Sequence, residues 1–141
     1  MMPLIGAEFP KKVAELFDDA KKNIDILTYD WRWHLNQPGH AVQQLNIALV
    51  RAVQRGVEVR AVLNRPDLVP TLLKVGVRAR VLKDRRTLHA KLILIDGKML
   101  VIGSHNLTRN AFGSNLEASL AVELPEGERR FQDFFNNLWG V

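Results

Sequence analysis

The chain has 141 residues, a formal net charge of +5 and no cysteine. This length suits one domain spanning residues 1–141, because such a chain can bury about two thirds of its unfolded surface without a disulfide or structural metal. The lack of cysteine excludes disulfides, iron–sulfur clusters, cysteine-ligated zinc and thiol catalysis.

The first part of the chain alternates helical and strand patterns. Apolar side chains recur at helical spacing in some segments and form short uninterrupted or alternating runs in others. Gly56 and Gly76 are expected to end two of the helices, since glycine readily closes a helix. In chain order the predicted elements are helix 10–22, strand 24–33, helix 42–53, strand 57–63, helix 67–75 and strand 77–82.

The second part of the chain carries a hairpin signal. Two apolar runs, 88–95 and 99–102, are separated by Asp96-Gly97. Both central residues of a tight type I′ turn need positive φ, which this dipeptide favours. A strand over 116–124 and a helix after Pro125 complete the pattern. Strands that alternate with helices, plus one hairpin, predict an α/β fold with a mixed β-sheet flanked by helices on both faces.

Polar residues around this hairpin suggest a chemistry. In a strand, His89 and Lys91 would project from one face, about 7 Å apart at their Cα atoms. The hairpin would return Gly103, Ser104 and Asn106 to their neighbourhood. Histidine can serve as nucleophile and as acid near neutral pH, while ammonium and amide groups can hold anionic oxygens. The set suits cleavage of a phosphodiester.

These residues also match a known family pattern. The run from His89 to Asn106 reads H-x-K-x4-D-x6-G-S-x-N and resembles the signature of the phospholipase D superfamily. Six fixed letters match by chance about once in 10⁷ to 10⁸ positions. Asp96 and Gly103 belong to this signature, and the turn chemistry favours a structural role for Asp96. The agreement continues through Thr108, Ala111, Asn115 and Glu117.

The resemblance implies a role for each matching polar residue. His89 would attack phosphorus and form a phosphohistidine intermediate. Lys91 and Asn106 would hold the phosphoryl oxygens, and Ser104 would be a lesser donor. Glu117 would orient and polarise His89, as the acid of a hydrolase triad orients its histidine.

The chain has one such motif, whereas most members of the superfamily have two. None of His34, His40 and His105 is followed two positions later by lysine. The resemblance therefore implies a homodimer in which two His89 residues share one active site. Short single-motif members resemble bacterial endonucleases that need no metal, and the sequence lacks a cluster with metal-ligand spacing. We expect neither a metal nor a cofactor.

The excess positive charge is concentrated before the motif. Residues 74–91 contain seven Lys or Arg and one Asp. A rim that follows nucleic-acid phosphates is the favoured interpretation, with DNA expected over RNA, and an ordinary solvated basic face is the alternative. The residues assigned to this rim are Arg78, Arg80, Lys83, Arg85 and Arg86.

Three aromatic residues at alternate positions allow two interpretations. Tyr29, Trp31 and Trp33 could stack on bases, but packing in the core or at a dimer interface is the expectation. His105 should point away from the site if its segment is extended. Arg109 could reach a phosphate.

The leading hypothesis is a metal-independent phosphodiesterase that acts on nucleic acid as an endonuclease. Two alternatives stay open: phospholipase or phosphatidyltransferase chemistry on a lipid headgroup, and a catalytically inactive nucleic-acid-binding domain. The chain starts without signal-peptide features and has no apolar run of about 18 residues, so we expect a cytoplasmic protein without stable membrane association. An apolar membrane-docking surface would favour the lipid alternative.

Overall fold

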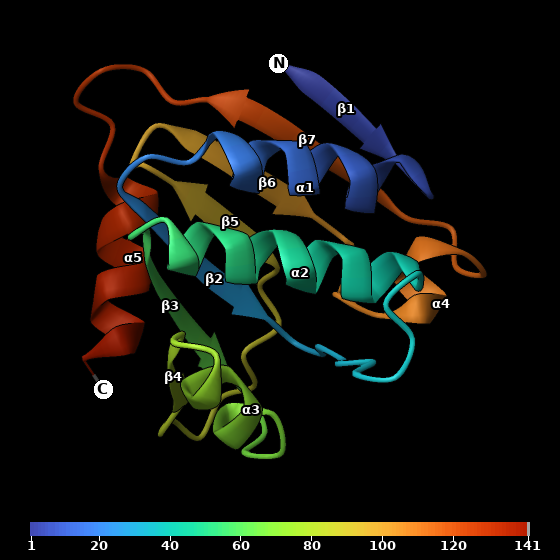
Figure 1. The fold of residues 1–141 in the computed structure, drawn as a ribbon. Coiled ribbons are helices and arrows are strands. Elements are labelled where there is room, and N and C mark those ends of the chain that lie inside the picture. Colours follow the sequence, from blue (N-terminus) through green and yellow to red (C-terminus); the bar gives the residue numbers. More distant parts are fainter. Residues whose placement is uncertain (141) are drawn as a thin grey trace.

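In the computed structural model, which describes residues 1–140, seven strands form one mixed sheet in the order β1-β7-β6-β5-β2-β3-β4 (Figure 1). The strands are β1 (Met2–Ile5), β2 (Asn23–Thr28), β3 (Glu58–Leu63), β4 (Arg78–Val81), β5 (Leu92–Ile95), β6 (Met99–Gly103) and β7 (Ala118–Glu123). The helices are α1 (Glu8–Asp19), α2 (Ala41–Gln54), α3 (Val69–Lys74), α4 (Arg109–Phe112) and α5 (Arg130–Trp139).

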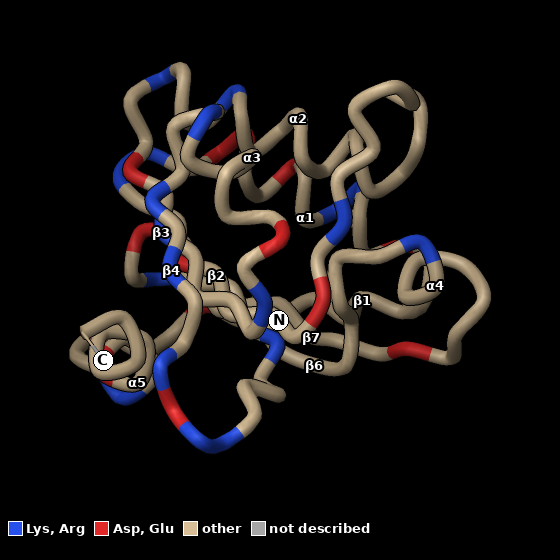
Figure 2. Tube along the Cα trace, turned by 90° about the horizontal axis from the view of Figure 1, so that it is seen from below, with Lys and Arg blue, Asp and Glu red and all other residues tan. Residues whose placement is uncertain are grey.

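The strand directions bring several chain segments to one edge of the sheet. β2, β3 and β4 are parallel, whereas β5 runs antiparallel to both β2 and β6. The ends of β2 at Thr28 and β3 at Leu63 therefore lie at the same edge as the start of β5 at Leu92. We call this the carboxyl edge, and Figure 2 looks onto it. Crevices at the ends of parallel strands are common ligand sites in α/β sheets.

Helices cover both faces of the sheet, which confirms the predicted fold class (Figures 1 and 2). α1 and α2 contribute fully buried Phe17 and Leu49 to the core on one face. α5 covers the other face, where Phe135 packs in a smaller core with Leu27 and Leu94. Each face of the sheet thus has its own apolar core.

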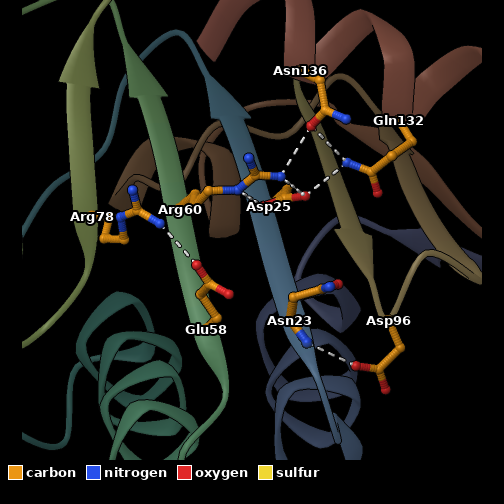
Figure 3. A network of polar contacts seen from close by, with 8 residues as sticks. All are labelled: Asn23, Asp25, Glu58, Arg60, Arg78, Asp96, Gln132 and Asn136. Atoms are coloured by element: carbon orange, nitrogen blue, oxygen red, sulfur yellow. Dashed lines mark hydrogen bonds and ion pairs between the residues drawn. The ribbon is translucent and has the colours of Figure 1, made fainter. Parts of the chain in front are cut away.

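A buried ion pair joins α5 to the sheet (Figure 3). The Asp25 carboxylate is 1% exposed and accepts two hydrogen bonds of 2.8 Å from the Arg60 guanidinium. Gln132 of α5 donates a third hydrogen bond of 2.9 Å, and the guanidinium stacks on Phe135 with its carbon 4.8 Å from the ring centroid. A buried charge is costly unless paired in this way, so the contacts specify where α5 docks.

The hairpin turn has the predicted geometry. Asp96 has φ 55° and Gly97 has φ 65°, as a type I′ turn requires. The Asp96 carboxylate also accepts hydrogen bonds of 2.6 to 3.0 Å from the backbone N–H groups of Lys21, Lys22 and Asn23. Burial alone would raise the pKa of Asp96, but these three donors outweigh it and lower the pKa. The turn lies at the edge opposite the carboxyl edge, a position that favours a structural role.

Several element boundaries differ from the prediction. The strand expected over 24–33 ends at Thr28, and the strand expected over 88–95 begins at Leu92. The two differences have one cause, because the antiparallel pairing of β2 with β5 stops at Leu27 and Leu92. The helix expected over 10–22 lies at Glu8–Asp19, and the sequence pattern predicted neither β1 nor α4.

Candidate active site

His89 and Lys91 lie together at the carboxyl edge, in an irregular segment just before β5. The Lys91 Nζ atom is 3.3 Å from His89 Nε2 and 3.5 Å from His89 Nδ1. It also donates a 3.0 Å hydrogen bond to the His89 backbone oxygen. Lysine therefore folds back over an exposed imidazole instead of projecting parallel to it from a strand.

Asn106 is held at the same edge by the end of β2. Its Oδ1 atom accepts a 3.1 Å hydrogen bond from the Asp30 backbone N–H and lies 3.5 Å from the Thr28 hydroxyl. Because these contacts occupy the oxygen, the amide nitrogen is left as the donor. An amide donor suits the non-bridging oxygens of a phosphate.

Gly103 and Ser104 bring the end of β6 against the start of β7. A Cβ at position 103 would collide with the backbone and side chain of Ser119, so only glycine fits there. The Ser104 hydroxyl accepts a 3.0 Å hydrogen bond from Ala118 N–H and donates to Ala118 O at 3.3 Å. The single hydroxyl proton of Ser104 is thus used within the sheet. The predicted role of Ser104 as a lesser donor to the phosphate would require its hydrogen bond to Ala118 O to break.

Glu117 is not brought to His89 of its own chain. Its carboxylate accepts a 3.3 Å hydrogen bond from the Asn115 side chain, and within residues 1–140 no hydrogen bond or ion pair joins Glu117 to His89. The intervening strand β6 separates the start of β7 from the start of β5. The orientation of His89 by Glu117, implied by the family resemblance, is therefore absent within a single copy.

His105 is buried, and it lines one small cavity together with Lys91 and Gly103. It is 2% exposed and stacks on Phe9 with the ring centroids 4.3 Å apart. Its Nδ1 atom lies 2.7 Å from the Ser119 hydroxyl and its Nε2 atom 2.9 Å from the Gly6 carbonyl oxygen. Burial is the largest influence on this side chain and lowers the pKa of His105.

The three alternating aromatic residues separate into different environments. Trp31 is 7% exposed and donates its indole N–H to Asn46 at 2.8 Å, which fits the expected core packing. Tyr29 is 39% exposed and meets the His89 ring edge-on, with centroids 5.6 Å apart. Lys91 Nζ lies 5.8 Å from the Tyr29 ring centroid. Tyr29 therefore belongs to the surroundings of His89, which the sequence pattern did not indicate.

The segment with excess positive charge divides into two parts. Arg78 pairs with Glu58 at 2.8 Å and stacks on Trp139, while Arg80 donates to the Trp139 carbonyl and lies over the same ring. These two arginines are thus fastened to α5. The other residues assigned to the rim lie in the loop 83–86, which projects beside the carboxyl edge in Figure 2. Its members are Lys83 and Arg85, both exposed, and Arg86, which pairs with Asp84.

Two kinds of surface flank His89. On one side is a groove of about 280 Å³ with mixed polar and aromatic walls, including Tyr29, Trp33 and Arg65. On the other side, next to α5, are two apolar hollows of about 270 and 300 Å³ that share Ala90 and Phe134. The Phe134 side chain is 45% exposed.

Residues 1–140 contain no group of three or more His, Asp or Glu side chains placed to hold a metal ion. Across the same residues, no helix has the length and apolar character needed to cross a membrane.

The fold and this histidine–lysine site define a class of proteins, the phospholipase D superfamily. Residues 13–139 match the family described as "Cardiolipin synthase, PLD-like domain", and the chain belongs to that family. A structure of Nuc from Salmonella typhimurium, a phospholipase D family member, superposes with a TM-score of 0.80 over 99% of this chain and 94% of Nuc, at 22% identity. That similarity establishes the shared fold.

Curated relatives cover much of this chain but are longer. Mitochondrial cardiolipin hydrolase from Danio rerio is 36% identical over 105 residues, which are 67% of this chain and 46% of the relative. Phospholipase D from Rickettsia conorii is 30% identical over 133 residues, which are 89% of this chain and 62% of the relative. The chain thus spans less than half the length of the cardiolipin hydrolase.

Proposed function

We propose that the protein is a metal-independent phosphodiesterase that cleaves nucleic acid as an endonuclease. The observation that carries this proposal is the Lys91 ammonium held 3.3 Å from an exposed His89 imidazole. A nucleophilic nitrogen and a fixed cation then meet at one phosphate. Lys91 and the Asn106 amide would stabilise the charge that develops on the non-bridging oxygens.

The reaction has two displacement steps. In the first, a neutral His89 nitrogen forms a bond to phosphorus while the bond to the leaving oxygen breaks, and an acid protonates that oxygen. In the second, water attacks the phosphohistidine, gives up a proton to the same acid, now acting as base, and releases His89. One imidazole cannot be nucleophile and acid in the same step.

A homodimer would supply the second imidazole. Each copy would contribute one His89 to a shared site on a two-fold axis. The position of Glu117 is compatible with this arrangement, because no hydrogen bond or ion pair joins it to His89 within residues 1–140 of one copy. In the proposed dimer, Glu117 of one copy would orient His89 of the other.

The positive charge of the loop 83–86 supports nucleic acid as the substrate, and we propose DNA in preference to RNA. The loop 83–86 carries exposed Lys83 and Arg85 and leads directly to His89. Such a loop would bind phosphates that flank the scissile one. Tyr29 offers an exposed ring beside the imidazole on which a base could stack.

A lipid phosphodiester is the second candidate substrate, and one observation favours it. The apolar hollows beside His89 expose Phe134 and Ile102, 45% and 37% exposed. Such a surface could receive acyl chains. The names of the curated relatives from Danio rerio and Rickettsia conorii point the same way.

A substrate panel in excess EDTA tests the proposal. Supercoiled plasmid, labelled single-stranded DNA and RNA, and vesicles containing cardiolipin or phosphatidylcholine would be incubated with the protein and with the variant His89→Ala. DNA cleavage that is lost in the variant supports the endonuclease. Hydrolysis of vesicle lipid alone supports the second candidate, and tight DNA binding without cleavage indicates an inactive binding domain. Activity that requires added magnesium would overturn the metal-independent mechanism.

A further inference from the structure

We propose that Asn64 is a positioning residue for His89, a role that rests on the proposed function of His89 as nucleophile. Asn64 directly follows β3 at the carboxyl edge. Its Nδ2 atom donates a 2.7 Å hydrogen bond to the Leu88 carbonyl oxygen, and its Oδ1 atom accepts a 3.0 Å hydrogen bond from the Leu88 N–H. One carboxamide thus satisfies both backbone groups of the residue before His89.

The Asn64 carboxamide, with its two hydrogen bonds to Leu88, acts as a clamp. It takes the place of a neighbouring strand that the segment before β5 lacks. β2 lies between β3 and β5 in the sheet, but it ends at Thr28, and β5 begins only at Leu92. Beyond the end of β2, the side chain of Asn64 spans the gap and holds the segment before β5 as a neighbouring strand would. Two hydrogen bonds to one residue fix its backbone direction more closely than a single bond does.

Asn64 also holds the aromatic neighbour of the imidazole. Its Nδ2 atom lies 3.3 Å from the carbonyl oxygen of Tyr29, whose ring meets His89 edge-on. On the other side the Leu88 side chain is 4% exposed and packs in the core beneath α5. The backbone before His89 is therefore anchored on both sides while the imidazole stays exposed. Fixed placement of a nucleophile is worth a large factor in rate, and a 1 Å displacement can cost about 100-fold.

The chemistry of the clamp requires an amide. Asparagine provides donors for two carbonyl oxygens and an acceptor for one N–H group. An ionised aspartate of the same shape keeps the acceptor, loses both donors and places negative charge against the oxygens of Leu88 and Tyr29. The variant Asn64→Asp therefore changes the bonding without leaving a cavity, and Asn64→Ala removes the group altogether.

The test compares steady-state kinetics and the state of the imidazole. Wild type, Asn64→Asp and Asn64→Ala would be assayed on bis(p-nitrophenyl) phosphate and on labelled single-stranded DNA in EDTA. We expect kcat to fall about 10- to 100-fold, while KM changes by less than about threefold, because the scissile phosphate still binds. The His89 imidazole signal in ¹H–¹³C NMR spectra should also shift. If Asn64 only stabilised the fold, its replacement would change neither kcat per folded molecule nor the His89 signal.

A matched control is Arg55→Ala. The Arg55 guanidinium donates to the carbonyl oxygens of Phe17 and Ala20 at 2.8 and 3.1 Å, so it too clamps backbone, but away from the carboxyl edge. This variant should retain wild-type kcat. If Asn64→Ala does not fold, Asn64→Ser provides a second truncation. Wild-type kcat and an unmoved His89 signal in the Asn64 variants would overturn the inference, even if His89→Ala is inactive. Full activity of His89→Ala would instead overturn the proposed function.

Discussion

The Lys91 ammonium contacts both ends of the histidine that precedes it by two residues, at 3.3 Å from His89 Nε2 and 3.0 Å from the His89 backbone oxygen. The backbone bond holds the lysine side chain over the ring. In the proposed mechanism, this places the cation in advance next to the position of a phosphate oxygen when the imidazole approaches phosphorus.

Replacement of Lys91 by methionine, which keeps most of the side-chain length and removes the charge, should lower kcat about 100- to 1,000-fold. The folding free energy should change by less than about 0.5 kcal/mol, because the side chain lies near the surface. Kinetics on bis(p-nitrophenyl) phosphate and urea denaturation measure the two effects. Lys98→Met, in the hairpin turn at the opposite edge, is the control, and equal activity of the two variants would show that Lys91 is dispensable.

Removal of Lys83 and Arg85 together should weaken DNA binding and its dependence on salt. Each lost phosphate contact reduces the slope of log K against log salt by about 0.9, so the double alanine variant should lower it by about 1.8. Fluorescence anisotropy between 50 and 200 mM salt would give the slopes. Lys11→Ala with Lys12→Ala removes the same charge from α1. If this control matches the loop variant, net charge and not the loop explains binding.

Asp96→Asn should destabilise the fold by about 1–3 kcal/mol at pH 7, because the charged acceptor of three backbone N–H groups is lost. The folded pKa of Asp96 is lowered, so its stabilising effect is present above the unfolded value of about 3.9. It is lost as pH falls through the folded pKa. Urea denaturation should therefore show a gap between variant and wild type at pH 7 that narrows under acid conditions. A difference in stability that does not depend on pH would contradict the stabilising role of the ionised Asp96 carboxylate.

Phe135→Ala should cost about 3–5 kcal/mol, because the ring is fully buried between α5 and the sheet. Phe134, its neighbour on the same helix, is 45% exposed, so Phe134→Ala should cost far less. Guanidinium denaturation of the pair measures the difference. Similar losses in both variants would mean that α5 does not pack through Phe135.

The sequence predicted the parts of the site that depend on local spacing. Asp96-Gly97 specifies a tight turn by its own conformational preferences, and that turn brings β6 back beside β5. The ends of the strands were harder to predict, because they depend on pairing between distant segments. At this edge the pairing of β2 with β5 ends at Leu27 and Leu92, and apolar residues continue in both segments beyond that point. Trp139 could not be matched to Arg80 by pattern, because they lie far apart in the chain. Asn64 was missed for a similar reason: a lone asparagine after a strand is ordinary until its contacts are known.

The most direct test of the account is to trap the covalent intermediate. Wild-type protein would be mixed with substrate in excess EDTA, quenched in alkaline denaturant that preserves phosphohistidine, and examined by intact-mass and peptide mass spectrometry. The account predicts, in wild type, an adduct on His89 that consists of the phosphorus and the part of the substrate still esterified to it, and no adduct in His89→Ala. Turnover in EDTA without an adduct on His89, together with activity in His89→Ala, would contradict it.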